Sequence, residues 1–132
     1  MSNVAEVTRR TFVERVLQAK RPVVVDFYAD WCMPCRRMSP TIERLATELA
    51  GEVDFVKLDI ERAPDIAAAY RISSIPSFLR FEDGHPVFAS VGVRPGRVLS
   101  QELHLPTRRR TRLLPPKDHV RSFPRLLRRR VG

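Results

Sequence analysis

The pair Cys32 and Cys35, which are both cysteines of this 132-residue chain, constrains the fold more than any other feature. The pair follows the apolar run of residues 22–29 and stands where a helix begins, with Pro34 in the first helical turn. A helix start directs free N–H groups and the positive end of its dipole at the first sulfur, which favours a Cys32 thiolate. A thiolate attacks disulfides, and a second thiol nearby can displace the resulting mixed disulfide. The spacing predicts redox chemistry, with Cys32 exposed and reactive and Cys35 shielded.

Two structural interpretations compete with redox chemistry. A Cys32–Cys35 bridge closes so small a loop that it stabilises the chain by only about 2 kcal/mol, and a domain of this length does not need it. A zinc site needs further ligands, but the chain has no second Cys-x-x-Cys pair, and His85, His104 and His119 are scattered without ligand spacing. We therefore expect no metal site.

Asp26 is an anomaly in the strand that precedes the cysteines. Its neighbours in the run PVVVDFYA are β-branched and aromatic residues typical of a strand buried on both faces. Burial removes water from the carboxylate and raises its pKa, which suits Asp26 to accepting and returning a proton near neutral pH. In the alternative interpretation, Asp26 caps a backbone group or forms a salt bridge with Lys57 of the neighbouring strand.

Five motifs, in order along the chain, resemble the thioredoxin family. The string VVVDFYADWCMPCRRMSP is similar to the active-site region of that family. The resemblance continues through residues 54–59, 73–78, 81–84 and 91–92, and it covers roughly residues 4 to 105. One departure lies inside the active-site motif, where Met33 occupies a position that usually holds Gly. The residues between the cysteines tune the stability of the dithiol.

The resemblance implies a protein-disulfide reductase. Cys32 would attack a substrate disulfide, Cys35 would resolve the mixed disulfide, and Asp26, through water and with support from Lys57, would handle the proton of Cys35. No cofactor would be bound, and a flavoprotein similar to thioredoxin reductase would regenerate the dithiol with NADPH. The implied partners are disulfide-containing client proteins, and we expect a monomer. The alternative is a thioredoxin-fold binding or scaffold module whose basic tail provides the main function.

The resemblance also implies a surface that docks the substrate beside the cysteines. The Ile75–Pro76 bond would be cis and would face the cysteines, with Ile75 offering strand-like backbone hydrogen bonds. From the residues alone, Pro76 only marks the approach to a strand, and Trp31 is either a recognition residue or plain packing. The implied substrate-binding residues are Trp31, Met33, Pro34, Ile75, Pro76 and Gly92.

The hydrophobic pattern predicts an α/β protein with a mixed central sheet and helices on both faces, which agrees with the thioredoxin fold that the resemblance implies. The predicted order is strand, helix, strand, helix, strand, helix, strand, strand, helix. After the cysteines, the core stripe of the helix is Met38, Ile42, Leu45 and Leu49. The predicted helices are residues 8–20, the stretch from the cysteines to Gly51, residues 64–70 and residues 96–105. The predicted strands include residues 23–28, 53–58, 78–81 and 87–91, the last two joined by the hairpin signal Asp83-Gly84.

The charge divides the chain into a neutral domain, residues 1–106, and a basic tail, residues 107–132. The tail holds ten Lys and Arg residues against Asp118 alone, so its charge of +9 equals that of the whole chain. Several prolines interrupt the tail, and we expect it to be disordered in isolation. Three interpretations stay open for the tail: contact with nucleic acid or an acidic partner, contact with an anionic membrane, or no evolved role.

Localisation is predicted from what the chain lacks. The amino terminus shows no apolar segment of the export-signal type, and no stretch approaches the length of a membrane span. With only the redox pair as cysteines, the composition fits a reducing compartment. We expect a cytoplasmic protein.

Overall fold

The computed structural model describes residues 2–106, so the expectations about the basic tail lie outside the described residues. The described elements follow the predicted order, beginning with a strand. They are β1 (Val4–Glu6), η1 (Val13–Leu17), β2 (Val23–Tyr28), α1 (Met33–Glu48), β3 (Asp54–Asp59), α2 (Pro64–Ala69), β4 (Ser77–Glu82), β5 (His85–Val91) and α3 (Gly96–Glu102).

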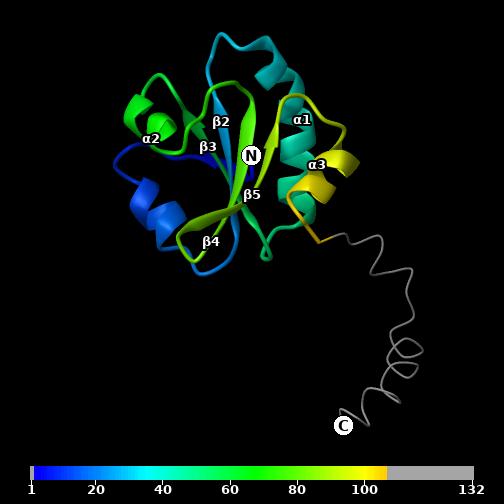
Figure 1. Ribbon diagram of the computed structural model, residues 1–132. Coiled ribbons are helices and arrows are strands. Elements are labelled where there is room, and N and C mark those ends of the chain that lie inside the picture. Colours follow the sequence, from blue (N-terminus) through cyan, green and yellow to red (C-terminus); the bar gives the residue numbers. More distant parts are fainter. Residues whose placement is uncertain (1, 107–132) are drawn as a thin grey trace, which may run out of the picture.

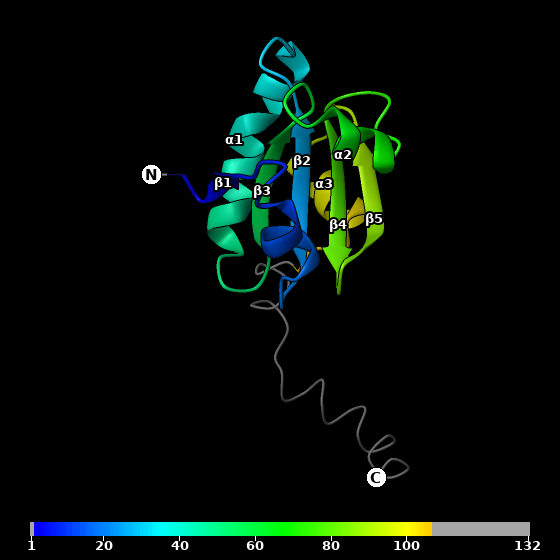
Figure 2. The same cartoon turned by 90° about the vertical axis from the view of Figure 1, so that its left-hand side faces the viewer.

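The five strands form one mixed sheet in the order β1-β3-β2-β4-β5 (Figure 2). Strand β3 pairs in parallel with both β1 and β2, whereas β4 pairs antiparallel with β2 and β5. Strand β2 is therefore covered on both edges, and Asp26 lies in register between Lys57 of β3 and Phe78 of β4. This central position keeps Asp26 away from the sheet edges.

Helices cover both faces of the sheet, as predicted (Figure 1). Helices α1 and α3 pack on one face, and η1 and α2 lie on the other. Because side chains alternate along a strand, β2 sends Val24 to the α1 face and Val25 to the opposite face. The predicted stripe of α1 is confirmed, since all of its members are buried: Met38, Ile42, Leu45 and Leu49. Asp26 shares the parity of Val24, so it points toward α1.

The prediction of a helix over residues 8–20 was wrong in extent. The chain turns first, with the amide of Phe12 donating to the Thr8 carbonyl, and then forms one wide helical turn, η1, over Val13–Leu17. The Gln18 amide closes that turn by donating to the Val13 carbonyl at 2.8 Å. This i→i−5 bond makes the turn wider than a turn of α-helix, so its side chains do not follow the 3.6-residue period. Val13, an apolar residue of this turn, is 50% exposed.

The last helix also ends earlier than predicted, at Glu102. His104 has a φ of +52°, which reverses the chain, and the Leu105 amide donates to the Ser100 carbonyl at 2.8 Å. Leu103 and Leu105 are buried although they follow the helix, so the apolar pattern in the sequence extends beyond the end of α3.

The predicted hairpin is confirmed at Asp83-Gly84, where both residues have positive φ angles, 51° and 82°. Two successive positive φ angles match the right-handed twist of the flanking strands β4 and β5. Within residues 2–106, no helix combines the length and apolar character that a membrane crossing requires.

Candidate active site

The cysteines stand at the start of α1, and they are joined by a disulfide. Cys32 is the N-terminal cap of the helix, and its Sγ accepts a hydrogen bond from the Cys35 amide at 3.1 Å. Pro34 lies in the first turn, where its missing N–H leaves no helical bond unmade. The backbone thus offers a hydrogen-bond donor to the sulfur of Cys32, which is the interaction that stabilises a thiolate there.

Exposure does not separate the two cysteines in this oxidised form, contrary to the prediction of an exposed Cys32 and a shielded Cys35. Cys32 is 3% exposed and Cys35 is 6% exposed. Both cysteines pack into one cluster with Ala29, and the half-buried Ile75 packs against this cluster. The difference between the two sulfurs lies in the hydrogen bond from the Cys35 amide to Cys32 Sγ.

Asp26 is buried beneath the disulfide side of α1, as its parity in β2 requires. Its Oδ1 has no hydrogen-bond partner among the described residues. Loss of water on burial raises the pKa of Asp26 to about 7, and the nearby positive charge of Lys57 opposes this rise. No salt bridge joins Asp26 to Lys57 in the described part of the chain, and the Lys57 Nζ lies over the Tyr28 ring, 5.4 Å from its centre.

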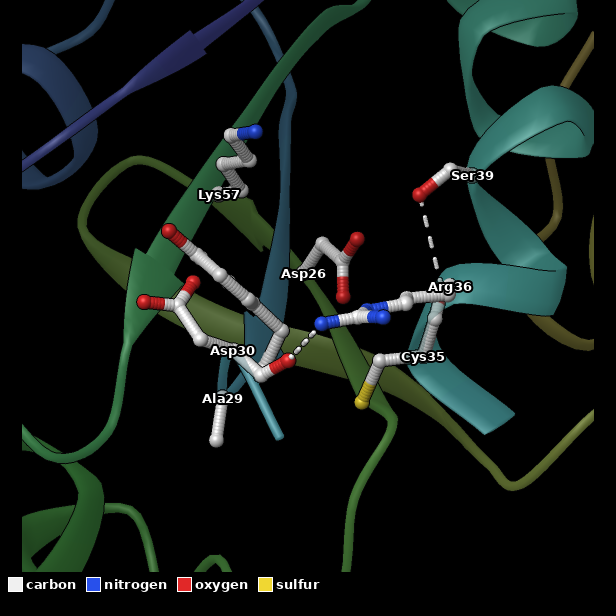
Figure 3. A pocket seen from close by; sticks show the side chains of 8 residues that line it. Asp26, Ala29, Asp30, Cys35, Arg36, Ser39 and Lys57 are labelled. Atoms are coloured by element: carbon white, nitrogen blue, oxygen red, sulfur yellow. Dashed lines mark hydrogen bonds between the residues drawn. The ribbon is translucent and has the colours of Figure 1, made fainter. Parts of the chain in front are cut away.

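A pocket of about 240 Å³ connects Asp26 with Cys35 (Figure 3). The lining residues come from β2 and β3, from the segment between β2 and α1, and from the first two turns of α1: Asp26, Tyr28, Ala29, Asp30, Cys35, Arg36, Ser39 and Lys57. Across the pocket, Arg36 Nη2 donates to the Asp30 carbonyl at 2.7 Å. Ser39 Oγ donates to the Cys35 carbonyl at 3.5 Å. The pocket gives Asp26 and Cys35 a common space large enough for water.

Sequence reasoning did not identify Arg36 and Ser39 as site residues. Both follow Cys35 on α1, at one and four positions, and a residue four positions on lies on the same helix face. That spacing was the available signal for Ser39. No comparable spacing rule marks the bond from Arg36 back to Asp30.

Two large apolar side chains are exposed beside the disulfide. Trp31 is 62% exposed and Met33 is 57% exposed. The indole of Trp31 is held by a hydrogen bond from its Nε1 to Glu61 Oε2 at 2.7 Å, and the Glu61 amide donates to Asp59 Oδ1 at 2.8 Å. Trp31 is therefore anchored at its polar edge while its ring stays open to solvent, so its position is not explained by core packing.

The Ile75–Pro76 peptide bond is cis, as the resemblance implied. Ile75 packs against the cysteine cluster, and Pro76 is buried. The Pro76 carbonyl accepts a hydrogen bond from the Gly92 amide at 2.8 Å. Gly92 has a φ of +91°, a conformation that side-chain-bearing residues rarely adopt. The loop before β4 and the end of β5 are thereby tied together next to the disulfide.

Within residues 2–106, no group of three or more His, Cys, Asp or Glu side chains is placed to hold a metal ion. The chemistry available to this site is that of two sulfurs, a buried carboxyl and a small pocket between them. This combination suits exchange between a dithiol and a disulfide.

Sequence comparisons agree with this site. The family model described as Thioredoxin matches residues 3–104. Thioredoxin 1 of Nostoc sp. (strain PCC 7120 / SAG 25.82 / UTEX 2576) is 41% identical over 103 residues, which cover 78% of this chain and 96% of that protein. Thioredoxin of Mycobacterium tuberculosis (strain ATCC 25618 / H37Rv) is 39% identical over 102 residues, which cover 77% of this chain and 88% of that protein.

A third relative is named for both a thioredoxin reductase and a thioredoxin. The bifunctional thioredoxin reductase/thioredoxin of Mycobacterium leprae (strain TN) is 37% identical over 98 residues, which cover 74% of this chain and 21% of that protein. The family match contains the disulfide, the Asp26 pocket and the cis-proline loop, and it ends before the basic tail. The chain belongs to the thioredoxin family and is a protein-disulfide oxidoreductase that works by thiol–disulfide exchange.

Proposed function

We propose that Cys32 is the attacking sulfur and Cys35 the resolving sulfur. In the reduced protein, the Cys32 thiolate attacks one sulfur of a client disulfide, and the other client sulfur leaves as a thiolate. Cys35 then loses its proton and attacks Cys32 Sγ, which forms the Cys32–Cys35 disulfide and releases the second client sulfur. Two electrons pass from the dithiol to the client. The observation that carries this order is the hydrogen bond from the Cys35 amide to Cys32 Sγ.

Substitution of each cysteine by serine tests this order. Cys32→Ser should abolish the reduction of insulin disulfides, because the attacking sulfur is gone. Cys35→Ser should attack clients but retain them as mixed disulfides, which non-reducing electrophoresis and mass spectrometry detect. Covalent trapping by Cys32→Ser, with none by Cys35→Ser, would reverse the assignment.

Asp26 is the group that we assign to the proton of Cys35. The proton passes from the Cys35 thiol to the Asp26 carboxylate through water in the shared pocket, and Asp26 later returns it to solvent or to the released client thiolate. The pKa of about 7 supports this role, since such a carboxyl exchanges protons at neutral pH. Lys57 supports the transfer by stabilising the carboxylate form.

Asp26→Asn tests the proton step separately from the attack. The variant should form mixed disulfides with clients at nearly the wild-type rate but resolve them more slowly, because no base takes the Cys35 proton. Rapid-quench measurement of both steps distinguishes them. An unchanged rate of resolution would remove Asp26 from the mechanism.

We also infer that the apolar surface around the disulfide docks the client. Trp31 and Met33 supply exposed area, Pro34 follows them on α1, and Ile75 lies against the cysteine cluster. The Gly92–Pro76 hydrogen bond keeps the cis-proline loop at the same place. An extended client segment could then pair with the backbone of this loop while its disulfide reaches Cys32.

The remaining assignments concern partners and location. We propose that a flavoprotein reductase returns electrons from NADPH to the Cys32–Cys35 disulfide, so that the protein acts as an electron carrier. The relative named as a bifunctional thioredoxin reductase/thioredoxin supports such a pairing. We further propose a monomeric protein of the cytoplasm, whose neutral domain, residues 1–106, carries the chemistry and whose tail contributes only binding.

A further inference from the structure

We propose that Arg36 is a positioning residue whose hydrogen bond to the Asp30 carbonyl closes one side of the pocket and limits the access of water to Asp26. This inference rests on the proposed proton transfer through Asp26. It extends the site to a side chain that lines the pocket together with Asp26 and Cys35.

The geometry places Arg36 as a strap between two elements. Its amide donates to the Cys32 carbonyl at 3.2 Å, so its backbone belongs to the first turn of α1. Its guanidinium reaches back to the segment between β2 and α1, where Nη2 donates to the Asp30 carbonyl at 2.7 Å. In Figure 3 this side chain extends from α1 toward Asp30, and Asp26 and Cys35 flank it in that view; all four residues line the same pocket.

The charge of Arg36 and its position have opposite effects on Asp26. A nearby cation stabilises the carboxylate and lowers its pKa, whereas a strap that excludes water destabilises the carboxylate and raises it. Desolvation is the larger influence on Asp26, and the positive charge that opposes it is that of Lys57. Because its side chain lines the pocket and is bonded across it to the Asp30 carbonyl, we assign the effect of Arg36 to the exclusion of water. The other ionisable groups that line the pocket are Tyr28, Asp30 and Lys57, and Cys35 joins them only after the disulfide is reduced.

This strap has a consequence for the chemistry. A more hydrated Asp26 would be a stronger acid and thus a weaker base toward the Cys35 thiol at neutral pH. By limiting hydration on one side, Arg36 keeps the Asp26 carboxyl in the range where it accepts and returns a proton. The proton still passes between Cys35 Sγ and the Asp26 carboxyl, and no electron moves through Arg36.

Arg36→Ala in the full-length oxidised protein tests the inference, with Arg37→Ala as the matched control. Arg37 is the next residue of α1, is exposed and does not line the pocket, so its substitution removes the same charge without opening the pocket. Carboxyl ¹³C NMR follows the titration of Asp26. Arg36→Ala should lower the Asp26 pKa by at least about 0.5, since water reaches the carboxyl, and Arg37→Ala should leave it unchanged. A rise in the Asp26 pKa, or no change, in Arg36→Ala would overturn the inference.

A kinetic measurement separates this inference from the proposed mechanism. In single-turnover reactions, the pH midpoint of the Cys35 resolution step should move to lower pH in Arg36→Ala, and the rate of Cys32 attack should stay the same. If Asp26→Asn does not slow resolution, the proposed proton transfer fails, whatever Arg36 does to the Asp26 pKa. If Asp26→Asn slows resolution but Arg36→Ala moves neither the Asp26 pKa nor the pH midpoint, the strap alone is refuted.

Discussion

Asp26, which is buried, and Arg80, which is half-buried, are two charged residues with opposite surroundings in this fold. They lie on neighbouring strands, β2 and β4, and both point to the α1 and α3 face of the sheet. Each keeps one buried polar atom without a hydrogen-bond partner among the described residues, Oδ1 in Asp26 and Nε in Arg80. The difference lies in their remaining polar atoms.

The other nitrogens of Arg80 are paired. Nη1 donates to the carbonyl oxygens of Leu103, at 3.1 Å, and of His104, and Nη2 donates to the carboxylate of Glu82. The guanidinium also lies over the ring of Phe88, 5.8 Å from its centre. Arg80 thereby satisfies the carbonyl groups that the end of α3 leaves free.

Asp26 has no such partners, and its pKa is raised to about 7. The Arg80 guanidinium stays protonated in any surroundings, and its paired nitrogens hold β4 and the end of α3 together. An unpaired buried carboxyl is easily protonated, which makes it costly for stability and useful for proton transfer. Paired and permanently charged, Arg80 serves the fold, whereas the buried Asp26 carboxyl, which has no hydrogen-bond partner for its Oδ1 among the described residues, is available for proton transfer.

Asp26→Asn should produce the largest change in stability. In the unfolded chain this carboxyl titrates near 3.8, and in the folded protein at about 7. Between these values the folded state binds more protons than the unfolded state, so the folded protein loses stability as the pH rises from about 4 to above 7. The full loss is on the order of 4 kcal/mol, since each pKa unit corresponds to about 1.4 kcal/mol.

Urea unfolding of the oxidised protein between pH 4 and pH 8 measures this loss. The wild-type free energy of unfolding should decline over the range, and the Asp26→Asn variant should lack the decline and be more stable at pH 8. Asp83→Asn removes an exposed carboxylate of the hairpin and controls for loss of a negative charge. A wild-type decline that persists in Asp26→Asn would show that other groups cause it.

Arg80→Met should have the next largest effect, in the opposite direction. Methionine keeps much of the apolar volume but removes the bonds to the Leu103 and His104 carbonyls and to Glu82. Hydrogen bonds of charged groups contribute about 1.5–3 kcal/mol, and we expect a loss of about 2–3 kcal/mol in the free energy of unfolding. Arg97→Met, at an exposed position of α3, should change it little. Equal stability of the two variants would mean that Arg80 does not hold α3.

Glu61→Ala tests a third charged residue, a carboxylate near the disulfide that is paired with the Trp31 indole. Loss of the acceptor frees the Trp31 indole to rotate, which should weaken the docking of clients that we propose for it. One hydrogen bond is worth about 1 kcal/mol, so the KM for insulin should rise about fivefold. Reduction of a small disulfide, which needs little docking surface, should not change, and Glu61→Gln should stay close to wild type. An equal effect on both substrates would place the defect in the chemistry instead.

The features that the sequence predicted well depend on local patterns. The strand around Asp26, the stripe of α1 and the Asp83-Gly84 hairpin follow from period-two alternation, helical periodicity and the need for positive φ angles. The burial of Asp26 followed directly from its place in an apolar run.

The features that the sequence did not predict depend on contacts between distant residues or on unusual backbone. No local pattern relates Arg80 to carbonyls more than twenty positions away, or Trp31 to Glu61. The wide turn η1 has i→i−5 bonding, which a search for 3.6-residue periodicity misses. The equal burial of Cys32 and Cys35 arises from their common packing with Ala29 and Ile75.

Removal of the tail should have the smallest effect on stability, because Asp26, Arg80 and the described residues around them precede it. Truncation after Pro106 keeps the carbonyl groups that Arg80 binds, and it should change the free energy of unfolding by less than about 0.5 kcal/mol. Truncation after Glu102 removes these carbonyls together with buried Leu103 and Leu105, and it should destabilise the protein at least as much as Arg80→Met.

Binding is the property that truncation after Pro106 should change. The ten basic residues of the tail can release counterions from nucleic acid or from anionic vesicles, so the full-length protein should bind them strongly at low salt and far more weakly at physiological salt. The shortened protein should lose this binding and still reduce insulin. Salt-insensitive or absent binding by the full-length chain would favour a tail without an evolved partner. Unfolding of the shortened protein would instead show that the tail contributes to the stability that we assign to Arg80 and the end of α3.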